Sequence, residues 1–100
     1  MFLLIANYIK PAEEVAIHIS AHSAWVKKYI TERIFLFAGP KKSKLGGVIL
    51  TKSMDKAVLK NILSEDSYIK QDVCDYQIID FDCKLVAPGL ELLLNEEIHI

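Results

Sequence analysis

The chain has 100 residues, of which 52% are hydrophobic and 25% are charged, a composition typical of one small globular domain and not of a disordered or collagen-like chain. Twelve basic and thirteen acidic side chains give a net charge of −1, so the sequence lacks the excess of cations that binding to nucleic acid requires. The apolar runs are too short to span a membrane, and the first of them lacks the features of a signal peptide. We therefore expect a cytoplasmic protein with neither a nucleic-acid nor a membrane partner.

Hydrophobic periodicity predicts four strands and two helices. Short, near-continuous apolar runs indicate the strands, and apolar residues that recur every three or four positions indicate the helices. Glycine and proline mark several of the turns between them. In chain order, the predicted elements are a strand at 2–9, a helix at 11–33, strands at 34–38 and 48–51, a helix at 54–65 with Ser53 as its N-cap, and a strand at 73–85.

The resulting order, β-α-β-β-α-β, predicts a ferredoxin-like α+β fold with an antiparallel sheet. Because no linker, repeat or change of composition interrupts the sequence, we treat residues 1–100 as a single domain. A short apolar segment at 90–94 is predicted to form a helix or a strand, and the pattern does not place residues 96–100.

The first three predicted strands are apolar on both faces, as in the run from Phe2 to Ala6. A sheet with one face in water should instead alternate apolar and polar residues. Two helices can cover only one face, so the other face needs a partner. A second copy of the chain, packed sheet against sheet as a two-fold homodimer, would satisfy this need. The alternative is that the C-terminal segment folds back over the open face, and we favour the homodimer.

Two histidines in the first predicted helix are candidates for chemistry. His22 lies on the apolar stripe, which points it toward the sheet, and an imidazole is suited to proton transfer near neutral pH. From the residues alone, a buried structural histidine with one hydrogen bond is the favoured interpretation. His18 lies one turn earlier, and a His-x-x-x-His pair can bind a metal. No third ligand accompanies the pair in the sequence, so we expect neither a metal nor a cofactor.

Asp66 and Trp25 each have a functional and a structural interpretation, and the two cysteines are tested for a disulfide. Asp66 is predicted at the end of the second helix, where an acid opposes the helix dipole; this marks either a functional residue or an ordinary helix terminator. Trp25 could line a pocket or belong to the core. Cys74 and Cys83 fall about 30 Å apart in one predicted strand, too far for a disulfide.

Together these features resemble the YciI-like (YCII-related) family. The resemblance covers about residues 1–84 and leaves 85–100 as a C-terminal extension. It rests on His22 in the first helix, on Ala-Gly-Pro at 38–40 after the second strand, and on Asp-Ser-Tyr at 66–68 after the second helix, in that order and at similar spacing.

The resemblance implies a dimeric α+β barrel with a pocket near His22 and Asp66. In that interpretation His22 is a general acid or base and Asp66 orients or charges it, while Trp25 and Tyr68 are candidate walls of the substrate pocket. One branch of the family resembles a lyase that removes chloride from a chlorinated hydroquinone. We therefore expect an acid–base lyase or an isomerase-type enzyme that acts on a small cyclic or aromatic substrate.

Several positions depart from the family pattern. His18 stands where an Arg or a similar residue is usual, Ser67 replaces a proline, and Asp72 replaces a glycine. The loop at 41–44 carries lysines where acids are common. These departures favour, as the alternative function, a non-catalytic dimeric module that binds a small molecule or an interaction partner.

Overall fold

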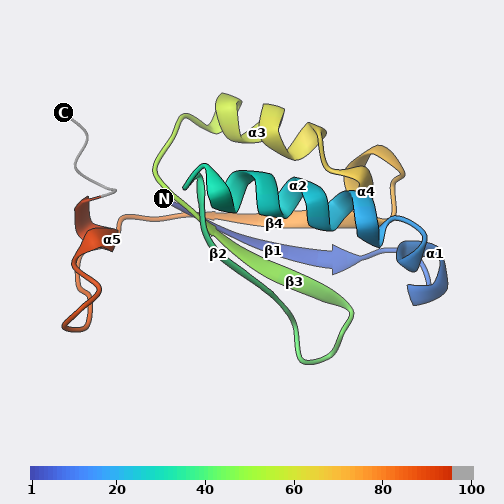
Figure 1. The fold of residues 1–100 in the computed structure, drawn as a ribbon, viewed down its shortest axis with the longest axis horizontal. Helices are drawn as coiled ribbons and strands as arrows, with labels where there is room; N and C mark the ends of the chain where they lie inside the picture. The colour runs from blue at the N-terminus through green and yellow to red at the C-terminus, as the bar shows by residue number, and fades with distance from the viewer. Residues whose placement is uncertain (96–100) are drawn as a thin grey trace.

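The computed structural model describes residues 1–95 as a four-stranded antiparallel sheet with helices packed on one face (Figure 1). Residues 96–100 lie outside the described part of the chain. The strands follow the order β2-β3-β1-β4, which confirms the predicted ferredoxin-like α+β fold. The elements are β1 (Phe2–Tyr8), α1 (Ala12–Ala16), α2 (Ile19–Thr31), β2 (Phe35–Pro40), β3 (Gly46–Thr51), α3 (Lys56–Ser64), α4 (Ser67–Lys70), β4 (Cys74–Asp80) and α5 (Leu92–Asn95).

The core lies between the sheet and the two long helices, α2 and α3. Alternate residues of β1, including Phe2 and Leu4, point into it because successive side chains of a strand face opposite sides. From α2, Trp25 is buried there, and its indole N–H donates to the backbone carbonyl of Ile62 in α3 at 3.0 Å. This hydrogen bond joins the two helices and holds the face of α2 that carries His22 over the sheet.

The first predicted helix is interrupted at residues 17–18 and forms α1 and α2. Val15 of α1 is buried in a small cluster with Tyr68 and Val73, away from the main core that α2 covers. A single straight helix cannot direct its apolar residues into both clusters, so the chain turns between them. Helix α2 restarts with His18 at its N-cap.

The second predicted helix is shorter than its pattern indicated, because its predicted cap has another partner. The hydroxyl oxygen of Ser53 accepts a hydrogen bond from the N-terminal ammonium group of Met1 at 3.1 Å. Helix α3 begins instead at Lys56, after Asp55, and it ends at Ser64. Two residues then separate its end from the start of α4.

The second and third strands run further than predicted, and they meet in a tighter hairpin. Strand β2 continues through Pro40, which is tolerated because β2 is an edge strand and an edge residue need not donate to the sheet on both sides. Strand β3 begins at Gly46, where a Cβ atom would lie 1.9 Å from the carbonyl oxygen of Ala6. A glycine is therefore needed for β3 to approach β1 this closely.

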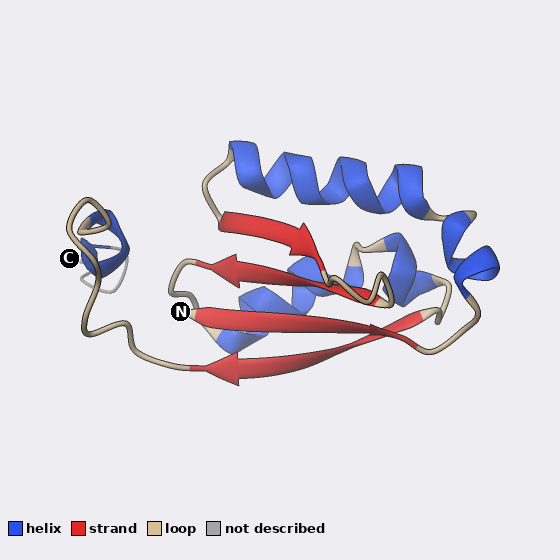
Figure 2. Ribbon diagram, turned by 90° about the horizontal axis from the view of Figure 1, so that it is seen from below, coloured by secondary structure: helices blue, strands red, loops and turns tan. Residues whose placement is uncertain are grey.

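Strand β4 ends at Asp80 and does not continue to residue 85 as predicted. Its partner β1 begins at Phe2, and the last pairing contact is the N–H of Phe81, which donates to the carbonyl of Met1 at 3.1 Å. Beyond this point β4 has no strand to pair with. The following segment leads to α5, which Figures 1 and 2 place beyond the end of the sheet. The described part of this segment therefore does not fold back over the open face.

The face of the sheet opposite the helices is apolar apart from Asn7, Asp75 and Gln77 at one end, and no described element covers it (Figure 2). Residues paired directly across neighbouring strands share a face. The register therefore places Leu3 beside Leu50 and Ile79, and Leu50 beside Phe37. The side chains of Phe37 and Ile79 are 52% and 38% exposed. This register confirms the prediction that the first three strands carry apolar residues on both faces.

Candidate active site

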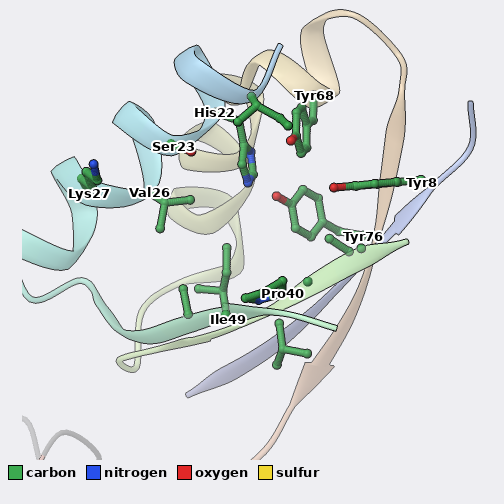
Figure 3. Close-up of a pocket in the computed structure, with 16 residues that line it drawn as sticks. Tyr8, His22, Ser23, Val26, Lys27, Pro40, Ile49, Tyr68 and Tyr76 are labelled. Carbon is green, nitrogen blue, oxygen red and sulfur yellow. The ribbon is translucent and has the colours of Figure 1, made fainter. Parts of the chain in front are cut away.

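A cavity of about 360 Å³ lies between α2, α4 and the helix-facing side of the sheet (Figure 3). Residues on all three contribute to its walls, so it exists only in the folded chain. Its polar lining comes from α2, α4, β1 and β4, and its apolar lining comes mainly from α2, β2 and β3. The lining includes Tyr8, His22, Ser23, Val26, Lys27, Ala38, Pro40, Gly46, Ile49, Tyr68 and Tyr76.

His22 and Asp66, 44 positions apart in the sequence, are in direct contact. The Nδ1 atom of His22 lies 2.7 Å from the Oδ1 atom of Asp66, and the side chain of Asp66 is fully buried. A carboxylate can only accept a hydrogen bond, so Nδ1 carries a proton in this contact. The side chain of His22 is 20% exposed. Its ring lines the cavity, and the other ring nitrogen, Nε2, is left for a bound molecule.

Asp66 is the N-cap of α4, not the end of α3 as the sequence pattern indicated. Its Oδ1 atom accepts the backbone N–H of Tyr68 at 3.1 Å, which is the usual role of an aspartate at the start of a helix. The dipole of α4 therefore favours this carboxylate, and the conflict that the sequence suggested is absent. Because the cap fixes the carboxylate, the contact with His22 is fixed as well.

Tyr76 supplies a third donor to Asp66. Its hydroxyl donates to the Oδ2 atom of Asp66 at 2.7 Å, so both carboxylate oxygens are occupied. Burial, followed by the neighbouring negative charge of Asp66, raises the pKa of Tyr76 well above its ordinary value. The hydroxyl therefore stays protonated and remains a donor across the whole physiological pH range.

Tyr68 contacts one face of the His22 ring. The two rings are stacked, with centroids 3.8 Å apart and planes 3° from parallel. Tyr8 meets Tyr68 edge to face at a centroid distance of 5.9 Å. Burial is the main cause of a strongly raised pKa at Tyr68, and a hydrogen bond with Tyr8 adds to it. Tyr68 is thus a neutral, rigid wall of the cavity.

The sequence-predicted site residues fall into two groups. His22, Asp66 and Tyr68 come together at the cavity, although Asp66 lies behind the ring of His22 and does not line the cavity itself. Trp25 belongs to the core: its ring centroid is 5.6 Å from that of His22, but it is not part of the cavity wall. It therefore supports His22 from within the protein.

His18 takes no part in the cavity. It caps α2 with its backbone carbonyl, which accepts the N–H of His22 and the hydroxyl of Ser67. Among residues 1–95, no group of three side chains of the types that ligate metals is close enough to hold an ion. In the same range, no helix has the length and hydrophobicity needed to cross a membrane.

Three residues that line the cavity were not predicted from the sequence, namely Tyr8, Tyr76 and Lys27. Tyr8 and Tyr76 alternate with outward-facing residues in β1 and β4, so their inward direction could have been read from the strand pattern. Nothing in that pattern indicates that the hydroxyl of Tyr76 meets Asp66. Lys27 stands next to Val26 on α2 and gave no signal, because charged residues near the end of a helix are common.

One solved structure illustrates the similarity of the fold. The 5-chloro-2-hydroxyhydroquinone dehydrochlorinase TftG from Burkholderia phenoliruptrix, in complex with 2,5-dihydroxybenzoquinone, aligns with a TM-score of 0.64 and 16% sequence identity. The alignment covers 81% of this chain and 93% of that one. At this sequence identity the match shows only that the two folds are similar. No curated protein matches the sequence at a significant level.

The family model for the YCII-related domain matches residues 1–82, which include every element from β1 to β4. The matched range contains His22, Asp66 and all of the cavity. It ends close to the boundary at residue 84 that the sequence motifs indicated, and the segment that leads to α5 lies outside it. The chain belongs to the family of YCII-related domain proteins.

Proposed function

We propose that this protein is a small acid–base enzyme, of lyase or isomerase type, that acts on a small cyclic or aromatic molecule. The observation that carries the proposal is the pairing of His22 with a fully buried carboxylate at the wall of a cavity. A histidine that served only the core would not need an open ring nitrogen beside an empty volume. Asp66 orients the ring of His22 and can compensate its positive charge, as a general base requires.

In the proposed reaction, Nε2 of His22 removes a proton from the substrate. Asp66 stabilises the resulting positive charge on the ring and keeps Nδ1 protonated. In an elimination, the electron pair of the broken C–H bond forms a new double bond, and the leaving group departs with its own bonding pair. In an isomerisation, the protonated ring returns the proton to a different substrate atom. A positioned acid–base group accelerates such steps by about 10²–10⁴-fold.

The similar structure supports the choice of substrate class. TftG is named as a dehydrochlorinase of a chlorinated hydroxyhydroquinone, and it was solved with a quinone. An elimination from a six-membered ring fits the chemistry that His22 and Asp66 can perform. The cavity, at about 360 Å³, is at the lower end of the range for ligand pockets and suits a molecule of this size.

The experiment that tests the proposal measures proton exchange, because that step needs no leaving group. The protein is incubated in deuterated buffer with a panel of cyclic enols, diketones and hydroquinones, and NMR follows the replacement of C–H by C–D. We expect catalysed exchange in at least one panel member, with a loss of about 10²-fold or more in His22→Asn. The Asn amide can still donate to Asp66, so the variant should fold.

His18→Asn is the matched control, since His18 is the N-cap of α2, one turn before His22, but does not line the cavity. Its exchange rate should equal that of the wild type. Exchange that survives in His22→Asn would exclude His22 as the base. Panel members that bind in the cavity without any exchange would instead identify the chain as a binding module.

We also propose that two copies assemble through the open face of the sheet. This face presents exposed Phe37 and Ile79 beside Leu3 and Leu50, and the described part of the C-terminal segment leaves it free. A two-fold axis lets the same apolar surface cover itself. Exposed apolar area of this kind is otherwise a liability for solubility.

Sedimentation equilibrium tests the assembly. We expect the wild type to be a dimer and Phe37→Asp to be a monomer, because a charge would be buried at the interface. Ile17→Asp is the control: Ile17 is 77% exposed but lies between α1 and α2, far from this face in the fold. A wild-type protein that sediments as a monomer would contradict the proposed interface.

A further inference from the structure

The charged groups around the cavity are unevenly distributed. Among residues 1–95, no carboxylate side chain lines it. Asp66 is the nearest acid to His22, but it is fully buried and its two oxygens are already bound by His22, Tyr76 and the N–H of Tyr68. The tyrosines that line the cavity beside it, Tyr68 and Tyr76, have raised pKa values and are neutral. A bound molecule therefore meets no negative charge in the wall.

Lys27 is the one lysine or arginine among the described residues that line the cavity. It is exposed, and Figure 3 shows it on α2 beside Val26, at the edge of the cavity. Within residues 1–95 it forms no ion pair, whereas the adjacent Lys28 lies 3.7 Å from Glu65 and over the ring of Tyr29. The charge of Lys27 is thus unpaired within the described residues, whereas that of Lys28 is paired with Glu65.

The sheet side of the cavity continues the same pattern. Pro40 and Gly46 line the cavity and are also the two ends of the β2–β3 hairpin loop. That loop carries Lys41, Lys42 and Lys44, of which Lys41 donates to the side chain of Asn7. None of these three lysines lines the cavity, but the loop that carries them begins and ends at its wall. A lysine-rich loop at this position favours the approach of anions.

The remaining wall is apolar. Val26 of α2 lies opposite Ile49 of β3, and Pro40 of β2 lies beside Ile49 (Figure 3). Ala38 of β2 also lines the cavity. His22 and Lys27 are five positions apart on α2, about 7.5 Å along the helix axis and about 140° around it, and both line the cavity. A bound molecule that contacts both residues therefore extends along α2 past Val26.

We propose that the cavity selects small organic anions that carry an apolar ring or a short apolar chain. The anionic group, a carboxylate or an ionised enol or phenol, lies toward Lys27, and the apolar part lies between Val26 and Ile49. The direction of the reactive atom toward Nε2 of His22 rests on the proposed function. The preference for anions over neutral molecules does not rest on it.

The test compares two matched pairs of probes, benzoate with benzamide and 2,5-dihydroxybenzoate with 2,5-dihydroxybenzamide. Each pair has the same ring and differs in charge. Binding is measured at low ionic strength from the shifts of backbone amides that line the cavity, such as those of Ser23 and Gly46. An exposed ion pair strengthens binding by about two- to fivefold, so the carboxylates should bind more tightly than the amides by about this factor. Added salt should reduce the difference.

Lys27→Met should remove the preference by weakening the carboxylates about two- to fivefold and leaving the amides unchanged. Lys28→Met is the matched control, and it should keep the preference. His22→Asn separates this proposal from the proposed function: a preference that persists there without proton exchange supports anion selection by itself. Equal binding of acid and amide by the wild type would overturn the proposal. It would also be overturned if Lys28→Met weakened carboxylate binding as much as Lys27→Met does. Absence of shifts at the cavity with all four probes would overturn it too.

Discussion

The imidazole ring of His22 lies flat against the phenol ring of Tyr68, with the centroids 3.8 Å apart and the planes 3° from parallel. The stack and the bond from Nδ1 to Asp66 restrain different motions: the stack sets the plane of the ring, and the hydrogen bond sets its rotation within that plane. Both restraints come from α4, because Asp66 caps this helix and Tyr68 is its second residue. One short helix therefore positions the histidine.

Substitution of Tyr68 should separate the stack from the hydroxyl group. Tyr68→Phe retains the ring and should lower the free energy of unfolding by about 0.5–1.5 kcal/mol, the usual value of one neutral hydrogen bond. Tyr68→Ala removes a buried ring and should cost about 3–5 kcal/mol. Urea denaturation measures both. If the two variants were equally stable, the ring would not contribute the packing that its burial indicates.

Asp66→Ala should be among the most destabilising single substitutions in the chain. It leaves the hydroxyl of Tyr76, Nδ1 of His22 and the N–H of Tyr68 without their acceptor, and the loss of one partner from such a buried pair costs about 3–5 kcal/mol. Asp55→Ala is the matched control, since Asp55 precedes α3 as its N-cap but is exposed and its side chain makes no capping hydrogen bond. Its unfolding free energy should change by less than about 1 kcal/mol. Similar losses in the two variants would contradict a special role for the network around Asp66.

The raised pKa of Tyr76 predicts a loss of stability in alkali. Above about pH 10 an unfolded tyrosine releases its proton while the folded Tyr76 retains it, so the unfolded chain binds fewer protons and stability falls as the pH rises. Below that pH the stabilising hydrogen bond to Asp66 is fully present. Tyr76→Phe should therefore be less stable than the wild type by about 1.5–3 kcal/mol near neutral pH. This difference in the free energy of unfolding between the wild type and Tyr76→Phe should become smaller above about pH 10. A difference that stays constant as the pH rises through this range would contradict the raised pKa of Tyr76.

The two cysteines should react at very different rates. Cys74 is buried in β4, and burial followed by the charge of Asp66 raises the pKa of its thiol to about 11. Cys83 is half-buried in the segment after β4. A thiol reagent applied to the native protein near neutral pH should therefore modify Cys83 first, because the reactive species is the thiolate. Mass spectrometry of peptides identifies the modified position, and early labelling of Cys74 would contradict its burial.

Hydrophobic periodicity determined the order of strands and helices, since that pattern depends on neighbours in the sequence and each element needs one apolar face. It also determined that His22 points inward from α2 and that the first three strands are apolar on both faces. The motifs around His22, residues 38–40 and residues 66–68 were sufficient to indicate the family, which the match over residues 1–82 confirms.

Tertiary structure decided where the elements end and how the site is assembled. The break before α2 and the end of β4 depend on which cluster Val15 enters and on where β1 begins, and neither is visible from local periodicity. The contact between His22 and Asp66 spans 44 positions and exists because α4 starts a new helix at Asp66, turning a residue that resembled a helix terminator into a cap. A sequence pattern sets which face of an element is apolar. Only the packing of α2, α4 and β4 sets which polar atoms meet on it.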